Sequence, residues 1–200
     1  MMKTVLIENT ENNVFEVNSD ACYVLLADDS SDGNYYLELL FNKKDVNAEI
    51  LGFFNLTADS KASITTVTRH IAPNTSCRTE VKGVLNNSSQ SDYVGKIIIE
   101  KGAQQTSSFL HDSVLILGDN TKNTSKPILE IEADDVRASH GATTGRIDKS
   151  QIYYLESRGL TREQAKKTIV RGYFMSLVSK ISNENIKEKV INKLKLQNDE

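Results

Sequence analysis

The chain has 200 residues, of which 38% are hydrophobic and 26% charged, with ten Gly and two Pro. Such a chain is long enough to bury a core unaided, which excludes disulfide-stapled, collagen-like and wholly disordered classes. The formal charge of −3 gives no overall excess of Lys and Arg, so we expect no nucleic-acid partner.

Up to residue 148 the apolar residues form short clusters of strand length, separated by turn-forming stretches such as APNTS and NNSSQSD. This pattern predicts a mainly β body, and it leaves a sandwich, a barrel and a solenoid open. No exact internal repeat is present, so a solenoid would have irregular turns. The clusters lie at residues 5–7, 14–17, 23–26, 35–40, 50–54, 81–85, 97–99, 114–117 and 128–131.

From about residue 149 the period changes to that of helices. Thr161 and Gln164 form a capping box, which satisfies free backbone donors at the start of a helix. The apolar residues behind it recur at spacings of three, four and one, which predicts an amphipathic helix of about five turns. A second amphipathic helix is expected after Ser182 and Asn183. The apolar positions are Ala165, Ile169, Val170, Tyr173, Phe174, Leu177, Val178 and Ile181 in the first helix, and Ile186, Val190, Ile191 and Leu194 in the second.

The charge divides at the same boundary. Residues 149–200 carry a formal charge of +5, and residues 1–148 carry −8. We therefore expect a β body at 1–148 and a helical domain at 149–200. A basic helical part on an acidic body either presents a solvated face or docks onto an acidic partner, and the sequence leaves both open.

The two cysteines, Cys22 and Cys77, show none of the spacings of a zinc site or a disulfide framework. Free thiols in a reducing compartment are the simplest interpretation. The N-terminus lacks the apolar run of a secretory signal, and no segment has membrane-spanning length. We expect a cytoplasmic protein with no membrane partner, in which the Asn-X-Ser/Thr triplets carry no glycans.

Two ligand motifs are absent. DDSSDG at residues 28–33 starts like a calcium loop, but Leu39 stands where a bidentate Glu is required, so we expect a polar turn. No Gly-rich phosphate loop is present, and a nucleotide would have to be bound by a partner.

Three histidines are candidates for chemistry. His70, His111 and His140 are too far apart for a local metal motif, although a fold that stacks distant strands could bring them together. His140 lies in the stretch 130–148, EIEADDVRASHGATTGRID, where small residues permit close approach of another backbone. That pattern suits a site pressed against another surface, and it suits a tight β corner equally well.

Residues 70–174 resemble the C-terminal half of the SufB/SufD proteins, the core subunits of the SUF iron-sulfur cluster assembly machinery. The resemblance rests on the DDV, SHGAT and LESRGL elements and on HIAPNTSCRTEVKGVLNNSSQSDYVGKIIIEKGAQQTSSFLHDSVLILGD upstream. The first 69 residues fit only by position and strand pattern. The resemblance implies a right-handed parallel β-helix with a C-terminal helical domain. Family members usually carry a sizeable N-terminal domain and a longer β-helix as well.

The resemblance also implies partners. SufB and SufD pair through their β-helices, and their C-terminal helices hold SufC, an ABC-type ATPase. We therefore expect a SufC-type ATPase and either a SufB-like subunit or an identical copy as partners. Ile169, Val170, Tyr173 and Phe174 would serve either packing or ATPase docking.

Single residues carry over as follows. His140 falls on the SufD histidine of a CSHGAT pattern at the SufB–SufD interface, so Ala138, Ser139, His140 and Gly141 are expected at a dimer interface. Ala138 replaces the Cys of that pattern, and Gly141 stands where SufB has Glu, which makes the chain SufD-like. His111 aligns with the SufB cysteine required for assembly.

Three functional hypotheses follow. The first is a non-catalytic platform subunit with no stably bound cofactor, which handles iron or a transient iron-sulfur cluster at His140 and His111. The second is a self-sufficient scaffold that shares a cluster across a homodimer through His111, His140 and Cys77. It is weakened because thiolates are the usual cluster ligands and Cys77 alone cannot supply four. The third is an unrelated β-solenoid binding or structural module without an iron-sulfur role.

Overall fold

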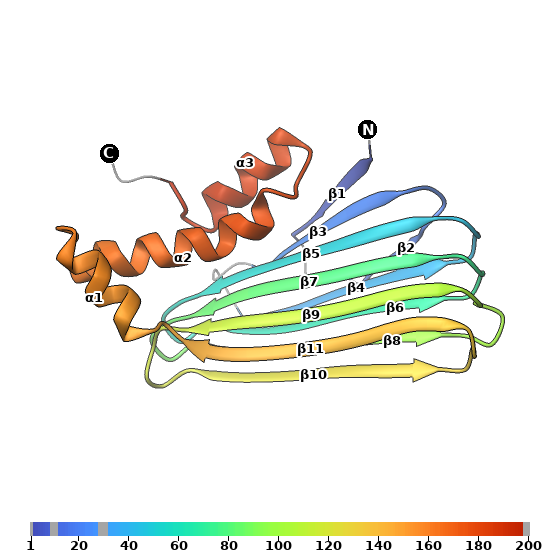
Figure 1. Cartoon of the computed structure of the whole chain (residues 1–200), viewed down its shortest axis with the longest axis horizontal. Coiled ribbons are helices and arrows are strands. Elements are labelled where there is room, and N and C mark those ends of the chain that lie inside the picture. Colours follow the sequence, from blue (N-terminus) through green and yellow to red (C-terminus); the bar gives the residue numbers. More distant parts are fainter. Residues whose placement is uncertain (1, 9–11, 28–31, 198–200) are drawn as a thin grey trace.

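A computed structural model describes residues 2–8, 12–27 and 32–197 (Figure 1). The predicted polar turn at 28–33 therefore lies, except for Asp32 and Gly33, outside the described residues. Within the described residues no helix is long and apolar enough to span a membrane.

The β body is a solenoid of parallel strands. Consecutive strands alternate between two sheets, an odd-strand sheet with the order β1-β3-β5-β7-β9-β11 and an even-strand sheet with the order β10-β8-β6-β4-β2. Every pairing is parallel, so the predicted β-helix is confirmed and a sandwich or barrel is excluded. The strands are β1 Lys3–Ile7, β2 Asn12–Glu16, β3 Ala21–Ala27, β4 Gly33–Phe41, β5 Asn47–Leu56, β6 Lys61–His70, β7 Ser76–Leu85, β8 Gln90–Ile99, β9 Thr106–Ile116, β10 Lys122–Ile131 and β11 Val136–Arg146.

The main core lies between the two sheets. Because side chains alternate across a strand, every second residue of β4 points inward, and these residues are Tyr35, Leu37, Leu39 and Phe41. Parallel register then stacks similar residues from turn to turn, which buries apolar surface between neighbouring turns.

The interior also contains a polar layer. On β6 the inward positions after Ile64 are Thr66, Thr68 and His70, and all three are buried. Buried polar groups of this kind need hydrogen-bond partners inside the protein. The imidazole of His70 has Thr75 Oγ1 at 2.8 Å from Nδ1 and Ser108 Oγ at 3.1 Å from Nε2, so both ring nitrogens are hydrogen-bonded.

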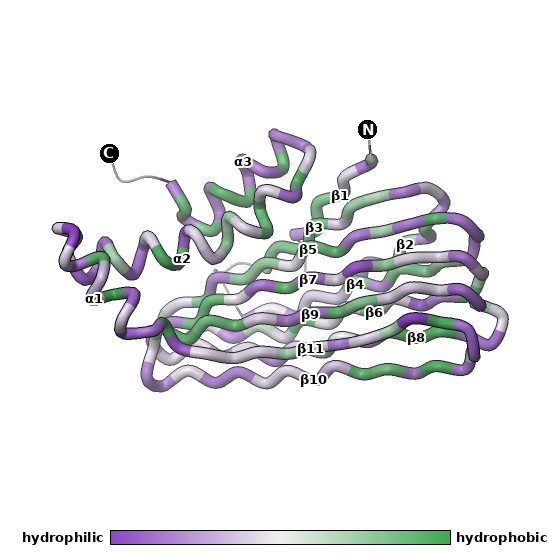
Figure 2. Tube along the Cα trace, viewed as in Figure 1, coloured by the Kyte–Doolittle hydropathy of each residue, from purple (hydrophilic) through white to green (hydrophobic). Residues whose placement is uncertain are grey.

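The helices are α1 Lys149–Ser157, α2 Arg162–Val178 and α3 Glu184–Lys193. α2 and α3 pack against the outer face of the odd-strand sheet, whereas α1 extends beyond the strand ends and contacts α2 (Figure 2). The predicted capping box is present, because Thr161 accepts from Gln164 N and the Gln164 side chain accepts from Thr161 N. Asn183 caps α3 in the predicted place. The second core consists of Cys22, Val24, Leu26, Leu51, Phe53 and Val84 from the sheet and Phe174, Leu177, Val178, Ile181, Val190, Leu194 and Leu196 from the helical part.

Candidate functional site at the end of the solenoid

The last turn of the solenoid leaves two strand edges open. β10 pairs only with β8, and β11 pairs only with β9, so each ends its sheet. Such edges carry unpaired backbone donors and acceptors and are templates for pairing with another chain. Ile128 and Ile131 on β10 are large apolar side chains that stay exposed, 37% and 41% respectively. The end of the solenoid therefore combines open strand edges with exposed apolar surface.

His140 lies at this open end. It pairs in register with Leu110, which points into the main core, so the His140 side chain is on the inward face of β11. It is nevertheless exposed, because no further turn covers β11. Ala138 shares the inward face, whereas Ser139 and Gly141 are on the outward face. Of the four expected interface residues, Ser139 and His140 are exposed and the other two are half-buried.

His111 lies on the other face of the same sheet. It pairs with Gly141, and a Cβ built on Gly141 would be 3.2 Å from His111 Nδ1, so the imidazole lies beside that glycine on the outer surface. His111 and His140 are therefore separated by the sheet. Within one chain they do not converge on a common ligand.

Cys77 does not join either histidine at the surface. It pairs with Ser108, which pairs in turn with Ala138, so its thiol lies inside the solenoid two strands from the open edge. Burial raises the pKa of Cys77 to about 12, which keeps the thiol protonated at neutral pH. In the described part of the chain, no three His, Cys, Asp or Glu side chains are grouped so that they could hold a metal ion.

Asp112 is a polar group at the open end that the sequence interpretation missed. It is fully buried, and its carboxylate oxygens form no well-aligned hydrogen bond, although the Ser125 hydroxyl and the Ser113 amide lie near them. Burial raises its pKa to about 6, while the hydroxyl of Ser125 acts in the opposite direction. The sequence pattern could have revealed this burial. Leu110 and Val114 lie two residues before and after Asp112 on one strand, and side chains alternate between faces, so Asp112 points inward with them.

The helical residues that were expected to pack or to dock are mostly engaged with the solenoid. Phe174 is fully buried in the second core, and Val170 and Tyr173 pack against it. The ammonium of Lys82 donates to the Tyr173 carbonyl at 2.7 Å and lies 4.4 Å from the centre of its ring, which ties α2 to β7. Ile169 is half-buried.

The aromatic surface of the helical part lies instead on α1. Tyr153 and Tyr154 are 74% and 57% exposed, and the guanidinium of Arg158 lies over the Tyr154 ring at 5.3 Å. Exposed aromatic residues beside an arginine are typical of protein interfaces. α1 falls within the helical domain expected at 149–200, but no apolar period identifies it as a separate helix, because Ile152 is its one buried residue.

Comparison with known proteins places these features in a family context. Residues 9–173 match the family described as SUF system FeS cluster assembly, SufBD core domain. The chain is 34% identical over 153 residues to an iron-sulfur cluster assembly SufBD family protein of Mycobacterium leprae, covering 72% of this chain and 39% of that protein. It is 35% identical over 109 residues to the iron-sulfur cluster assembly protein SufD of Bacillus subtilis, covering 54% and 25% respectively. For SufD of Escherichia coli the identity is 34% over 110 residues, with coverage of 55% and 26%. The chain thus spans between a quarter and two fifths of the length of these relatives.

Proposed function

We propose a function on the premise that this chain belongs to the SufBD family of the SUF iron-sulfur cluster assembly system, to whose core domain residues 9–173 match. Its similarity to two SufD proteins makes the chain SufD-like, and family membership removes the hypothesis of an unrelated solenoid. Our proposal is that it is a non-catalytic platform subunit, for which iron or a nascent cluster is substrate and not a resident cofactor.

The observation that carries this proposal is the open end of the solenoid. Unpaired edges of β10 and β11, with Ile128 and Ile131 exposed beside them, favour pairing with another β-solenoid. His140 would then lie at the junction, because its exposed side chain is on the inward face of β11, the last strand of its sheet. An imidazole in that place is a suitable ligand for iron.

The partner has to complete the ligand set. His140 and His111 lie on opposite faces, and the buried Cys77 is held protonated, so one chain offers a single exposed imidazole at the junction. Thiolates are the usual ligands of iron-sulfur clusters. This favours a SufB-like subunit that supplies further ligands. A homodimer would offer two His140 side chains related by symmetry, and it remains the alternative form of the proposal.

The helical part is the proposed docking element for a SufC-type ABC ATPase. Phe174 and Tyr173 are needed to hold α2 on the sheet, so the docking surface would use Tyr153 and Tyr154 of α1. Deleting the helical part is a poor test, because it would expose the apolar outer face of β3 and β5. Point substitutions on α1 avoid this problem.

The first test compares masses in solution. The chain is measured alone, with a SufC-type ATPase and with a SufB-like subunit, together with the ATPase rate. We expect a stable complex with altered ATP turnover, and at least about tenfold weaker ATPase binding for Tyr153→Ala combined with Tyr154→Ala. Val14→Ala, at an apolar residue of β2 that is 51% exposed, is the control. The docking proposal fails if wild type forms no complex at micromolar concentration.

A second test addresses His140. After anaerobic reconstitution of the complex, iron and sulfide are quantified for wild type, His140→Ala and Thr143→Ala, an exposed outward-facing residue of the same strand. We expect His140→Ala alone to lower cluster content, with an unchanged circular dichroism spectrum. Equal cluster content in all three proteins would contradict a role of His140. Stoichiometric iron and sulfide in the isolated chain would instead support the homodimeric scaffold.

A further inference from the structure

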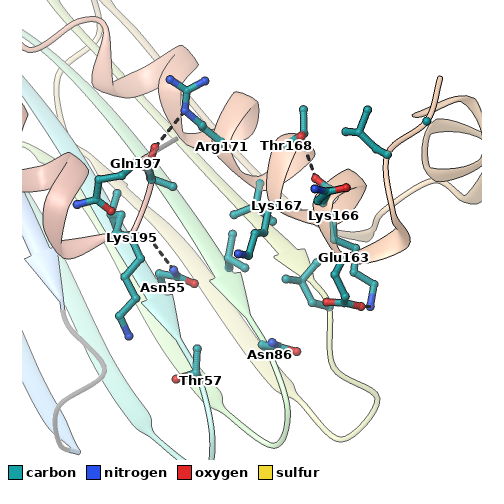
Figure 3. Close-up of a pocket in the computed structure, with 18 residues that line it drawn as sticks. Asn55, Thr57, Asn86, Glu163, Lys166, Lys167, Thr168, Arg171, Lys195 and Gln197 are labelled. Carbon is teal, nitrogen blue, oxygen red and sulfur yellow. Dashed lines mark hydrogen bonds and ion pairs between the residues drawn. The ribbon is translucent and has the colours of Figure 1, made fainter. Parts of the chain in front are cut away.

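The helical part is fixed on the side of the solenoid, away from the edge of β10. The Asn55 amide donates to the Leu194 carbonyl at 3.1 Å, and Arg171 Nε donates to the Leu196 carbonyl at 3.0 Å (Figure 3). A hollow of about 740 Å³ remains between α2, the segment after α3 and the sheet. Figure 1 shows β10 well apart from α2 and α3, so these two helices leave its free edge uncovered.

The backbone of β10 faces its neighbour β8 with every second residue. At the start of the strand, Lys122 N donates to Ser89 O at 3.2 Å. Just after its end, Glu132 N donates to Ile99 O at 2.9 Å. Because the backbone groups of successive residues point to opposite sides of a strand, the even-numbered residues of β10 bond to β8. The odd-numbered residues of 123–131 therefore direct their N–H and C=O groups to the free edge.

Pro127 lies in the middle of this free edge. Proline has no N–H, so between Ser125 and Leu129 the edge offers a carbonyl but no donor. A strand laid along β10 would leave one of its own carbonyls unpaired at this point, and the pyrrolidine ring would obstruct its approach. Pro127 thus divides the free edge of β10 into two short segments.

The free edge of β11 has no such break. In β9, Ser107 N donates to Thr75 O at 3.0 Å, so the odd-numbered residues of β9 bond to β7 and the even-numbered ones bond to β11. Leu110 is therefore bonded to the residues on either side of its register partner His140, and His140 itself directs its backbone to the free edge. The same holds for every even-numbered residue of 136–146, and none of them is proline.

Pro127 lies at the same level of the open end as His140. β10 and β11 run in opposite directions on the two sheets (Figure 1), and Asn123 Nδ2 donates to Thr144 Oγ1 at 2.7 Å. Pro127 follows Asn123 by four residues, and His140 precedes Thr144 by four residues. The break in the edge of β10 is therefore across the solenoid from the exposed imidazole.

We propose that Pro127 determines the specificity of the junction. Strand pairing runs without interruption along β11, and the break in β10 weakens pairing with a second copy more than pairing with a different solenoid end. In a two-fold dimer each copy brings its own Pro127, so two donors are missing whichever edges pair. A partner without proline at that point leaves one donor missing and keeps more hydrogen bonds. This inference rests on the proposed pairing at the open end, and it favours the SufB-like subunit over the homodimer.

The first test restores the donor. Pro127→Val supplies an N–H and a residue of high β propensity, and it changes no bond to β8. In sedimentation equilibrium, we expect self-association of the isolated chain to become about tenfold stronger, because a dimer regains two donors. Binding of the SufB-like subunit should become only about threefold stronger. Hydrogen exchange of the variant dimer should show protection of the new amide at position 127.

The control for this test is Thr124→Val on the same strand. Thr124 is exposed and its backbone faces β8, so the substitution adds a similar apolar side chain without changing the free edge. It should leave self-association and binding of the SufB-like subunit unchanged.

The second test moves the break to β11. Ala142→Pro removes one donor from the uninterrupted edge, and Gly141 before it has no Cβ to clash with the new ring. We expect binding of the SufB-like subunit to become at least about tenfold weaker. Urea unfolding verifies that the variant is folded.

Two results would overturn the proposal. The first is self-association of Pro127→Val no stronger than that of wild type and Thr124→Val. The second is a folded Ala142→Pro that binds the SufB-like subunit as tightly as wild type does. If the wild-type chain binds no SufB-like subunit, the proposed function fails. The self-association of Pro127→Val still decides the role of Pro127 in that case, because it is measured on the isolated chain.

Discussion

At the scale of single residues, a buried histidine in the polar interior of the solenoid makes the stability of the fold depend on pH. His70 is fully buried, stacks on Phe41 with 4.3 Å between ring centroids, and contacts the hydroxyls of Thr75 and Ser108 through its two nitrogens. Burial lowers its pKa from 6.5 to about 3. At pH values between about 3 and 6.5 the imidazole is therefore neutral in the native state, whereas it binds a proton in the unfolded chain.

The sign of the effect follows from proton uptake. Between pH 3 and 6.5 the unfolded state binds more protons at His70 than the native state does, so the free energy of unfolding falls as pH falls. Well above pH 6.5 neither state binds a proton at His70, so the full stability of the native state is retained there. Asp112 acts in the opposite sense, since its raised pKa favours the native state as pH falls toward 4. A variant comparison is therefore needed to isolate His70.

We predict that the low pKa of His70 lowers the free energy of unfolding of the wild-type protein by about 2 kcal/mol when the pH falls from 7 to 5. Urea unfolding at the two pH values measures the change in the free energy of unfolding. Because Asp112 contributes equally to both proteins, this change should be about 2 kcal/mol more unfavourable for wild type than for His70→Gln, which should itself be less stable at pH 7. The exposed His140→Gln is the matched control. If wild type and His70→Gln lose the same free energy between pH 7 and pH 5, the native state does not exclude the proton from His70.

At the scale of elements, alternation of polar and apolar residues found the strands whose inward face is apolar. β4 is such a strand, with a cluster at 35–40 inside it. β6 was missed, because its inward positions include Thr66, Thr68 and His70, so burial there does not coincide with hydrophobicity. β11 was missed for a related reason, since its small and polar residues line an uncovered end. α2 was found, because one face packs on the sheet and its capping box is local in sequence.

The same packing leads to a prediction for α2. Phe174→Ala removes a ring buried between α2 and the outer face of the odd-strand sheet, and it should lower the free energy of unfolding by about 3 to 5 kcal/mol. Chemical denaturation measures the change. Tyr153→Ala, at a ring that is 74% exposed on α1, should change stability by less than about 0.5 kcal/mol. Equal effects of the two substitutions would contradict the assignment of Phe174 to packing and Tyr153 to the surface.

At the scale of the whole molecule, strand register decides which residues share a face. The sequence suggested that His111 and His140 could converge, but Gly141 and not His140 pairs with His111. A register difference of one residue moves a side chain to the opposite face. The register depends on the length of each solenoid turn, and that length is irregular in this chain. The sequence motifs therefore identified the two histidines but could not show that the sheet separates them.

The architecture of the whole chain predicts where pairing occurs. A parallel solenoid has open strand edges at both ends, β1 and β2 at one and β10 and β11 at the other. Ile131 is an exposed residue in register with the buried Ile99 of β8, so it belongs to the inward face of the last turn. Ile131→Lys should place a charge at the junction and weaken pairing with the SufB-like subunit, or with a second copy, by about tenfold or more.

Val14→Lys puts the same charge on β2, at the opposite end of the even-strand sheet, where the native side chain is 51% exposed. Sedimentation equilibrium measures the association constants of both variants, and hydrogen exchange of the complex reports which backbone amides become protected. Protection should appear in β10 and β11, because new strand pairing would satisfy their free edges. Protection confined to β1 and β2, with full pairing by Ile131→Lys and loss of pairing by Val14→Lys, would place the junction at the other end and remove His140 from it.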